Sequence, residues 1–336
     1  MNQLPLGVMY RCDNPPENLP AYARLVERLG YDELWVVEDC FFTGAVSAAA
    51  VAAAATERLT VGIGILPAAF RNPALAAMEL SNLGRLFPGR IQAGFGHGIA
   101  AWVNQVGAAH PSPMAVLGET VEAVRRLLAG HKVSAAGRHV RLSEVALEFP
   151  PPVPVPIFTG VRNEKSLRLS GRVADGTILA EGESPGYVRW ARERIDEGRR
   201  EAGRTDEHRL TVYVHLDFDQ GRRSARREVA ARLANPRHPL PPPDGDLAAE
   251  VVELRSRTSS LDELADALPD RYLDRFAAAG DADQCARSVA GLQAAGADAV
   301  VFVPPRDPQL AVAHLTLAAE HLLPMLRGSA LRRPAR

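Results

Sequence analysis

Several features that would narrow the function are missing from this 336-residue sequence. Cysteine occurs only at Cys12, Cys40 and Cys285, a wide spacing that gives neither an even disulfide set nor a zinc-ligand pattern. The net charge of −1 argues against the basic face typical of nucleic-acid-binding proteins. No apolar run reaches the roughly 18 residues of a membrane-spanning helix, and the amino terminus lacks the regions of a secretory signal. We therefore expect a cytoplasmic protein that acts on a small molecule without a metal, nucleic-acid or membrane partner.

The fingerprint of a dinucleotide-binding sheet is missing too. The segments at 62–66 (GIGIL) and 94–98 (GFGHG) contain Gly-x-Gly but lack the third glycine in register, and no such motif follows the first apolar run. A doubly wound sheet is therefore not favoured.

A repeating strand–helix pattern is present instead, and the stretch from Leu59 to Gly98 shows it most clearly. An apolar run at 59–66 is followed by a helical pattern that Asn72 and Pro73 open, and a second apolar run follows at 90–95. Similar runs predict eight strands, at 4–10, 33–37, 59–66, 90–95, 155–160, 174–182, 210–217 and 297–303. Eight strands with intervening helices predict a single (β/α)8 barrel domain over 1–336, with a hairpin at 131–148 and a helical insertion at 219–280.

In such a barrel the functional residues lie at the carboxyl ends of the strands. Glu38 and Asp39 follow the second strand, where a carboxylate either binds a ring N–H, accepts a proton or caps the next helix. His97 follows the fourth strand between glycines that leave space beside it, and is a candidate proton donor, a hydrogen-bond partner or a plain loop histidine. Glu38, Asp39 and His97 are therefore the candidate catalytic residues.

The other strand ends supply candidate binding residues. Gly62, Gly64 and Pro67 predict a distorted end to the third strand, because glycine inside a strand often marks a bulge or a close approach. The segment from Thr159 to Ser166 runs from a strand into a helix N-terminus and predicts a phosphate-binding cradle. Glu181 lies at the carboxyl end of the sixth predicted strand, where the chain enters the next loop. The residues expected to line the substrate pocket are Arg11, Cys40, Phe70 and Trp102.

Several of these segments match the sequence pattern of a known family. The segments LGYDELWVVEDCFF, LTVGIGILPAAFRNP, VPIFTGVRNEKS and AGADAVVFVPP occur in the order of that family. The chain resembles the bacterial-luciferase-like superfamily of flavin- or deazaflavin-dependent oxidoreductases, and most of all its coenzyme F420-dependent branch, similar to methylenetetrahydromethanopterin reductase.

The resemblance implies a barrel that holds the deazaflavin ring in its mouth, on a non-prolyl cis peptide at Gly64–Ile65 with the Gly98 turn beside it. Asp39 matches the position that approaches the ring. The implied cofactor-binding residues also include Glu181 and the phosphate loop, which comprises Thr159, Gly160, Val161, Arg162, Asn163, Lys165 and Ser166.

One departure from the family pattern concerns the proton donor. Related enzymes often carry histidine directly after the acidic residue of strand two, and this sequence has Cys40 there. His97, Glu38 or Asp39 must then take over that task, or the task is absent. The basic residues that hold the phosphate in sugar-phosphate dehydrogenase relatives have no evident counterpart, so we do not expect a sugar phosphate as substrate.

The resemblance predicts hydride transfer between the deazaflavin C5 of coenzyme F420 and a small organic substrate, preferably as reduction of an activated C=C or C=N bond. An FMN-dependent monooxygenase of the same fold is the alternative. A third hypothesis is a barrel that binds the cofactor without catalysing a reaction. Cys40 favours it, because this cysteine stands where related enzymes often have histidine. Family members are commonly dimers, so the resemblance also allows a homodimer of this chain.

Overall fold

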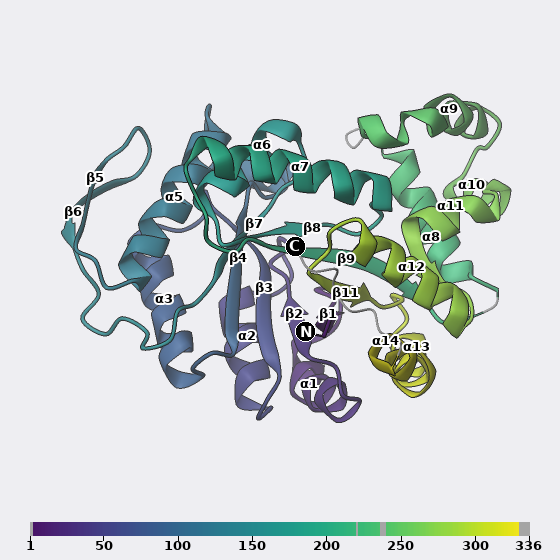
Figure 1. The fold of residues 1–336 in the computed structure, drawn as a ribbon, viewed down its shortest axis with the longest axis horizontal. Helices are drawn as coiled ribbons and strands as arrows, with labels where there is room; N and C mark the ends of the chain where they lie inside the picture. Colours follow the sequence, from purple (N-terminus) through teal and green to yellow (C-terminus); the bar gives the residue numbers. More distant parts are fainter. Residues whose placement is uncertain (1–2, 220, 236–239, 329–336) are drawn as a thin grey trace. The chain divides into compact units, whose positions relative to one another are not determined.

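The computed structural model describes residues 3–219, 221–235 and 240–328 (Figure 1). These residues divide into two compact units. The first unit comprises residues 9–178 and 194–209, and the second comprises residues 3–8 and 179–193 together with the described residues from 210 to 328. The predicted treatment of 1–336 as one domain stays a prediction.

The first unit is built on parallel strands that neighbour one another in chain order. These strands are β2 (Glu33–Val36), β3 (Thr60–Pro67), β4 (Ile91–Gly96), β7 (Ile157–Gly160) and β8 (Gly176–Leu179). The helices of this unit are α1 (Leu19–Arg28), α2 (Ala45–Ala54), α3 (Pro73–Leu86), α4 (Ala100–Gln105), α5 (Pro113–Leu128) and α6 (Glu164–Val173). Because the strands run parallel, their carboxyl ends lie at one edge of the sheet.

The helix boundaries follow the local signals in the sequence. The side chain of Asn72 accepts a hydrogen bond from the backbone N–H of Ala74 at 2.9 Å, and Pro73 occupies the first helical position of α3. The predicted opening of this helix is confirmed. The short helix α4 follows β4, and no side chain caps its start.

A two-stranded antiparallel sheet interrupts the alternation of strands and helices after α5. It pairs β5 (Val133–Ala136) with β6 (Arg141–Val145), which confirms the predicted hairpin.

The second unit also contains parallel strands, in the order β10, β9, β11, β1. They are β1 (Leu6–Tyr10), β9 (Arg209–Asp217), β10 (Ala277–Ala279) and β11 (Ala299–Val303). Helix α7 (Pro185–Glu201) begins in this unit, and the carboxyl-terminal helices are α12 (Ala282–Ala294), α13 (Pro308–Leu317), a π-helical turn at Ala318–Leu322 and α14 (Leu323–Gly328). Asp281 caps α12 in a reciprocal pair with Gln284.

The segment after β9 contains the predicted helical insertion. Its helices are α8 (Arg223–Ala234), α9 (Ala248–Ser256), α10 (Leu261–Ala267) and α11 (Asp270–Phe276), with a 3-10 turn at Pro242–Leu247. These helices share a hydrophobic cluster that includes Val229, Leu264 and Tyr272. The strand β10, made of three alanines, was not predicted.

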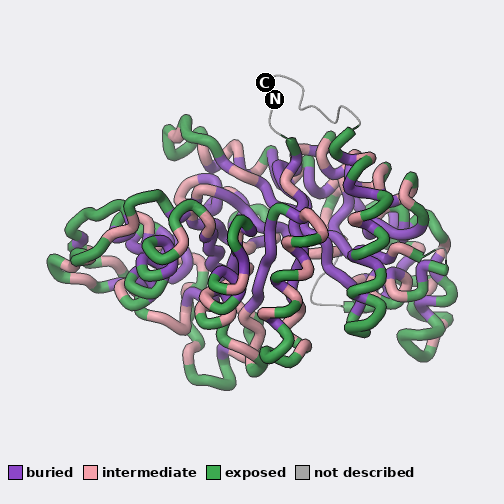
Figure 2. The backbone as a smooth tube through the Cα atoms, turned by 90° about the horizontal axis from the view of Figure 1, so that it is seen from below, coloured by how far each residue is buried: buried purple, intermediate pink, exposed green. Residues whose placement is uncertain are grey.

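Within the described residues, eight parallel strands alternate with helices along the chain: β1, β2, β3, β4, β7, β8, β9 and β11. Figure 2 shows buried backbone along the strands and exposed residues on the helices. This is the predicted (β/α)8 architecture, and it directs attention to the carboxyl ends of the strands.

Candidate active site

The third strand ends in a bulge. Its pairing with β4 shifts register between Ile63 and Leu66, and the intervening Gly64–Ile65 peptide bond is cis. Both the predicted distortion and the predicted cis bond are confirmed. A second non-prolyl cis bond, Cys40–Phe41, follows β2 and was not predicted.

Three glycines receive the side chain of Ile65. A Cβ atom added at Gly160 would lie 2.6 Å from Cγ2 of Ile65, and one added at Gly94 would lie 3.0 Å from the same atom. A Cβ atom added at Gly96 would lie 2.9 Å from Cδ1 of Ile65. We call Gly94, Gly96 and Gly160 the glycine socket. The glycines of the fourth strand therefore do leave room beside the backbone, but the side chain of Ile65 occupies that room.

Glu38 is bound on both carboxylate oxygens. Its Oε1 pairs with Nη1 of Arg71, and its Oε2 accepts Nη2 of Arg71 at 2.7 Å and the backbone N–H of Ala45 at 3.0 Å. The Ala45 contact places the carboxylate at the N-terminus of α2, where the helix dipole stabilises negative charge. Of the roles predicted for Glu38, the geometry fits the helix cap.

Asp39 lies beside the thiol of Cys12. The Cys12 Sγ donates to Oδ2 of Asp39 at 3.3 Å. Burial, followed by the Asp39 charge, raises the pKa of Cys12 to about 12, so this thiol stays protonated. Burial also raises the pKa of Cys40.

Arg11, a predicted pocket residue, makes two hydrogen bonds to the carboxylate of Asp13, at 3.2 and 3.3 Å, at the end of the neighbouring strand β1.

His97 connects the end of β4 to the first turn of α6. Its Nε2 lies 3.3 Å from Oγ of Ser166, and this hydroxyl lies 3.1 Å from the sulfur of Met114. Burial lowers the pKa of His97, and the backbone carbonyl of Pro113 opposes the shift. The imidazole is therefore largely neutral at pH 7. Gly98 follows with a φ of +70°, which suits glycine.

The N-terminus of α6 is available to a ligand. Asn163 is its N-cap residue and makes no side-chain cap hydrogen bond. The side chains of Asn163 and Lys165 are exposed, Arg162 is half-buried and Val161 is buried. Free backbone N–H groups and the helix dipole at such an end favour an anion, although the Glu164 carboxylate lies in the same turn.

Thr159, by contrast, faces the core. Its Oγ1 donates to Oγ of Ser170 at 2.6 Å, and Ser170 bonds in turn to Oγ1 of Thr177 at 2.6 Å. Thr177 reaches Nε2 of His208 at 2.8 Å, completing a buried polar chain. The predicted cradle is thus divided: Thr159 and Ser166 are buried and bonded inside the protein, while Asn163 and Lys165 face solvent.

Aromatic side chains surround these strand ends. Phe70 follows β3 and Trp102 lies on α4, and both are half-buried. Phe41 and Phe42 follow β2 and are 62% and 57% exposed. Sequence reasoning did not select Phe41 and Phe42, although large apolar residues directly after a strand end were a usable signal.

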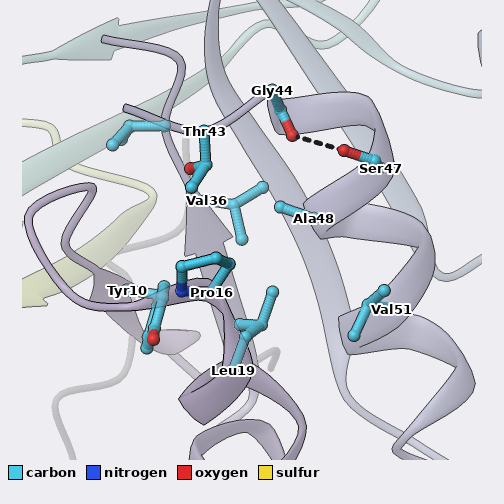
Figure 3. Close-up of a pocket in the computed structure, with 10 residues that line it drawn as sticks. Tyr10, Pro16, Leu19, Val36, Thr43, Gly44, Ser47, Ala48 and Val51 are labelled. Carbon is cyan, nitrogen blue, oxygen red and sulfur yellow. Dashed lines mark hydrogen bonds between the residues drawn. The ribbon is translucent and has the colours of Figure 1, made fainter. Parts of the chain in front are cut away.

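Two cavities lie in the first unit. One, of about 170 Å³, lies beside the end of β4, and we call it the His97 cavity. It is lined by Ala68, Ala69, Gly96, His97, Gly98, Ala100, Val103, Asn104, Ala108, Ala109, His110, Pro113 and Val116. The other, of about 120 Å³, is lined by residues of α2 and of the segments around β1, α1 and β2, and we call it the α2 cavity (Figure 3). Ala48 and Val51 of α2 face it (Figure 3).

Glu181, the remaining candidate, belongs to the second unit. It is half-buried on the loop after β8, next to Gly182, whose φ is +78°.

No group of three or more His, Cys, Asp or Glu side chains in the described part of the chain is arranged to hold a metal ion. Within residues 3–219, 221–235 and 240–328, no helix has the length and apolar character needed to cross a bilayer.

Comparison with known families matches residues 4–299 to the luciferase-like monooxygenase family. The chain belongs to this family. The resemblance read from the sequence is thereby confirmed, since the match covers most of the chain.

Two relatives are each less than 30% identical to this chain. A 5,10-methylenetetrahydromethanopterin reductase of Methanolobus tindarius is 25% identical over 311 residues, which cover 90% of this chain and 94% of the relative. An F420-dependent glucose-6-phosphate dehydrogenase of Beutenbergia cavernae is 28% identical over 332 residues, covering 93% and 94%.

Among solved structures, the coenzyme F420-dependent tetrahydromethanopterin reductase of Methanopyrus kandleri superposes with a TM-score of 0.81 at 20% identity, over 97% of this chain and 100% of that structure. This structural similarity confirms the (β/α)8 fold predicted for the chain.

Proposed function

We propose that this luciferase-like protein is a coenzyme F420-dependent oxidoreductase that transfers a hydride between the deazaflavin C5 and a small organic substrate. The preferred direction is reduction of an activated C=C or C=N bond. The observation that carries the proposal is the β3 bulge at Gly64–Ile65, held by the glycine socket at the end of the strand. The F420-dependent relatives named above support the choice of cofactor.

The residues at the strand ends suit such a cofactor. The α6 N-terminus, with exposed Asn163 and Lys165 and the nearby Arg162, offers N–H donors and positive charge to a phosphate. The bulge and Asp39 would hold the ring. When bound, the deazaflavin supplies the hydride chemistry, and the protein supplies binding and orientation.

The side chains of the site divide into groups that position and groups that transfer protons. Glu38, with both carboxylate oxygens bound, fixes the loop after β2. His97 is buried and largely neutral, so one ring nitrogen donates and the other accepts. It is therefore the strongest candidate for hydrogen bonding to a substrate or holding a proton. Asp39 remains a second candidate, with the Cys12 thiol donating to it.

An FMN-dependent monooxygenase is the alternative, and the family's description as luciferase-like monooxygenases favours it. A catalytically silent barrel is the third candidate, because Cys40 occupies the place of a family histidine and burial raises the pKa of its thiol. Cytoplasmic location and a homodimer remain part of the proposal.

Fluorescence titration with F420 and with FMN tests the proposal. We expect F420 to bind and Lys165→Ala to weaken its binding about fivefold, since one charge–phosphate contact contributes about 1 kcal/mol. The chain's other lysine, Lys132, pairs with Glu144 on the hairpin, so Lys132→Ala is a matched control. FMN binding with no F420 binding would replace this proposal with the monooxygenase. Reduced F420 oxidation over a panel of enones and imines then separates an active enzyme from a silent barrel.

A further inference from the structure

The His97 cavity has an apolar wall and a few polar groups. The wall is built from small side chains, among them Ala68, Ala108, Val103 and Val116. Its polar side chains are His97, Asn104 and His110. An apolar cavity with a small number of polar groups is the usual make-up of a site for a small organic ligand, in which the polar groups fix orientation.

The volume of the His97 cavity limits the size of that ligand. An apolar protein cavity of about 150 Å³ accommodates one benzene molecule. At about 170 Å³, the His97 cavity has room for a single six-membered ring with one small substituent, and its exposed residues Asn104 and His110 leave one side open to solvent. A sugar, with hydroxyl groups on nearly every carbon, would place several of them against the alanine and valine side chains of the wall, and each hydroxyl buried there without a partner costs about 1–3 kcal/mol.

The charge of the cavity limits the ligand further. In the described chain, the thirteen residues that line it include no Asp, Glu, Lys or Arg. A phosphorylated or carboxylated ligand would therefore enter without a charged partner, and unpaired charge in an apolar site is strongly unfavourable. His97 does not supply the missing charge, because burial lowers its pKa.

The location of the cavity ties it to the proposed reaction site. Ala68 and Ala69 directly follow the β3 bulge, and Gly96 ends β4 within the glycine socket. His97 contacts Ser166 in the first turn of α6, the proposed phosphate-binding helix. The cavity therefore adjoins both parts of the proposed cofactor site.

We infer that the His97 cavity binds the substrate, and that the substrate is an uncharged molecule with one six-membered ring and a carbonyl or imine group that hydrogen-bonds to His97 or Asn104. This inference rests on the proposed function for the reaction, but the binding site is defined by the cavity alone. It separates this chain from its glucose-6-phosphate dehydrogenase relatives.

Binding of two probes tests the inference without any turnover. 2-Cyclohexen-1-one represents the neutral ring, and glucose 6-phosphate represents the anionic sugar; each is titrated against the protein by ligand-observed NMR. Ala108→Leu fills the His97 cavity, because Ala108 is half-buried and lines it. Ala48→Leu is the matched control, because Ala48 is also half-buried but lines the α2 cavity. Thermal unfolding confirms that both variants fold.

We expect 2-cyclohexen-1-one to bind the wild type and Ala48→Leu alike, and Ala108→Leu at least tenfold more weakly, with no saturable binding of glucose 6-phosphate. The inference is wrong if the ring does not bind the wild type, if Ala108→Leu leaves its affinity unchanged, or if glucose 6-phosphate binds. It is also wrong if Ala108→Leu weakens only F420, because the cavity would then belong to the cofactor. Failure of F420 to bind the wild type, with ring binding as expected, would overturn the proposed cofactor alone.

Discussion

Arg71 binds both carboxylate oxygens of Glu38 through two guanidinium nitrogens, and Glu38 in turn caps helix α2 through the N–H of Ala45. The pair joins the loop after β2 to the start of α3, two segments that are separated by a strand and a helix in the chain. The Glu38 carboxylate is the leading cause of the raised pKa of Arg71.

Glu38→Gln is expected to lower the free energy of unfolding by about 1.5–3 kcal/mol, because charge-assisted hydrogen bonds of a half-buried group are lost. Urea denaturation measures this change. Glu79→Gln is the control, because Glu79 contacts the same guanidinium at 3.3 Å but is 43% exposed, and its loss should cost less than about 1 kcal/mol. Equal losses for the two variants would contradict the positioning role of Glu38.

The glycine socket predicts a coupled effect between two positions. Gly160→Ala should destabilise by about 1–3 kcal/mol, because its Cβ would lie 2.6 Å from Cγ2 of Ile65. In the double variant with Ile65→Ala that clash is absent, since the remaining distance to Cβ of residue 65 is an ordinary 3.6 Å. The double variant should therefore lose clearly less stability than the sum of the single variants.

Gly94→Ala is the control for this cycle. Its added Cβ would also meet Cδ1 of Ile178 at 2.6 Å and the backbone oxygen of Ile63 at 3.0 Å, so Ile65→Ala should not relieve it fully. Additive losses at Gly160, or an equal rescue at Gly94, would count against the socket.

The pH dependence of stability should carry a contribution from His97. Burial lowers the pKa of His97 below the usual value of about 6.5, so the unfolded chain binds the proton more readily than the folded one. The free energy of unfolding therefore rises with pH through this window, and the contribution is lost as the pH falls below about 6.5. Urea unfolding between pH 5 and 8 should show a shallower slope for His97→Gln than for wild type. His131→Gln, at an exposed position, should keep the wild-type slope.

The three thiols should react slowly. Burial is the leading cause of the raised pKa in each, to about 12 for Cys12 and Cys285, so little thiolate forms at pH 8. Labelling of the native protein with Ellman's reagent should be much slower than in urea. Asp39→Asn should accelerate labelling of Cys12, because the Asp39 charge contributes to its high pKa. Rapid native labelling of all three would refute the assigned environments.

Sequence reasoning succeeded where the signals are local. The helix from Pro73, capped by Asn72, and the apolar strands before and after it were predicted from residues within a few positions of each boundary. The cis bond at Gly64–Ile65 came from the family resemblance, because no periodicity marks a peptide isomer.

The remaining features depend on residues that are distant in the chain. The glycines of β4 were interpreted as empty space, and Gly160 of β7 as part of a phosphate cradle. Only the register of these strands with β3 shows that Ile65 lies against all three glycines. Similarly, the roles predicted for Glu38 did not include an ion pair with Arg71, because Arg71 is 33 positions away in the chain. The strand β10 consists of three alanines, which intrinsically favour helix, and tertiary pairing with β9 overrides that preference.

The glycine socket also has an evolutionary consequence. Because the same Ile65 side chain occupies the space of three glycines, positions 65, 94, 96 and 160 cannot drift independently. A descendant that gains a methyl group at position 160 must first, or soon after, shrink the side chain at 65. The ends of strands β3 and β7 would then be coupled by a short ordered series of permitted substitutions, which narrows the routes by which this barrel mouth can be remodelled.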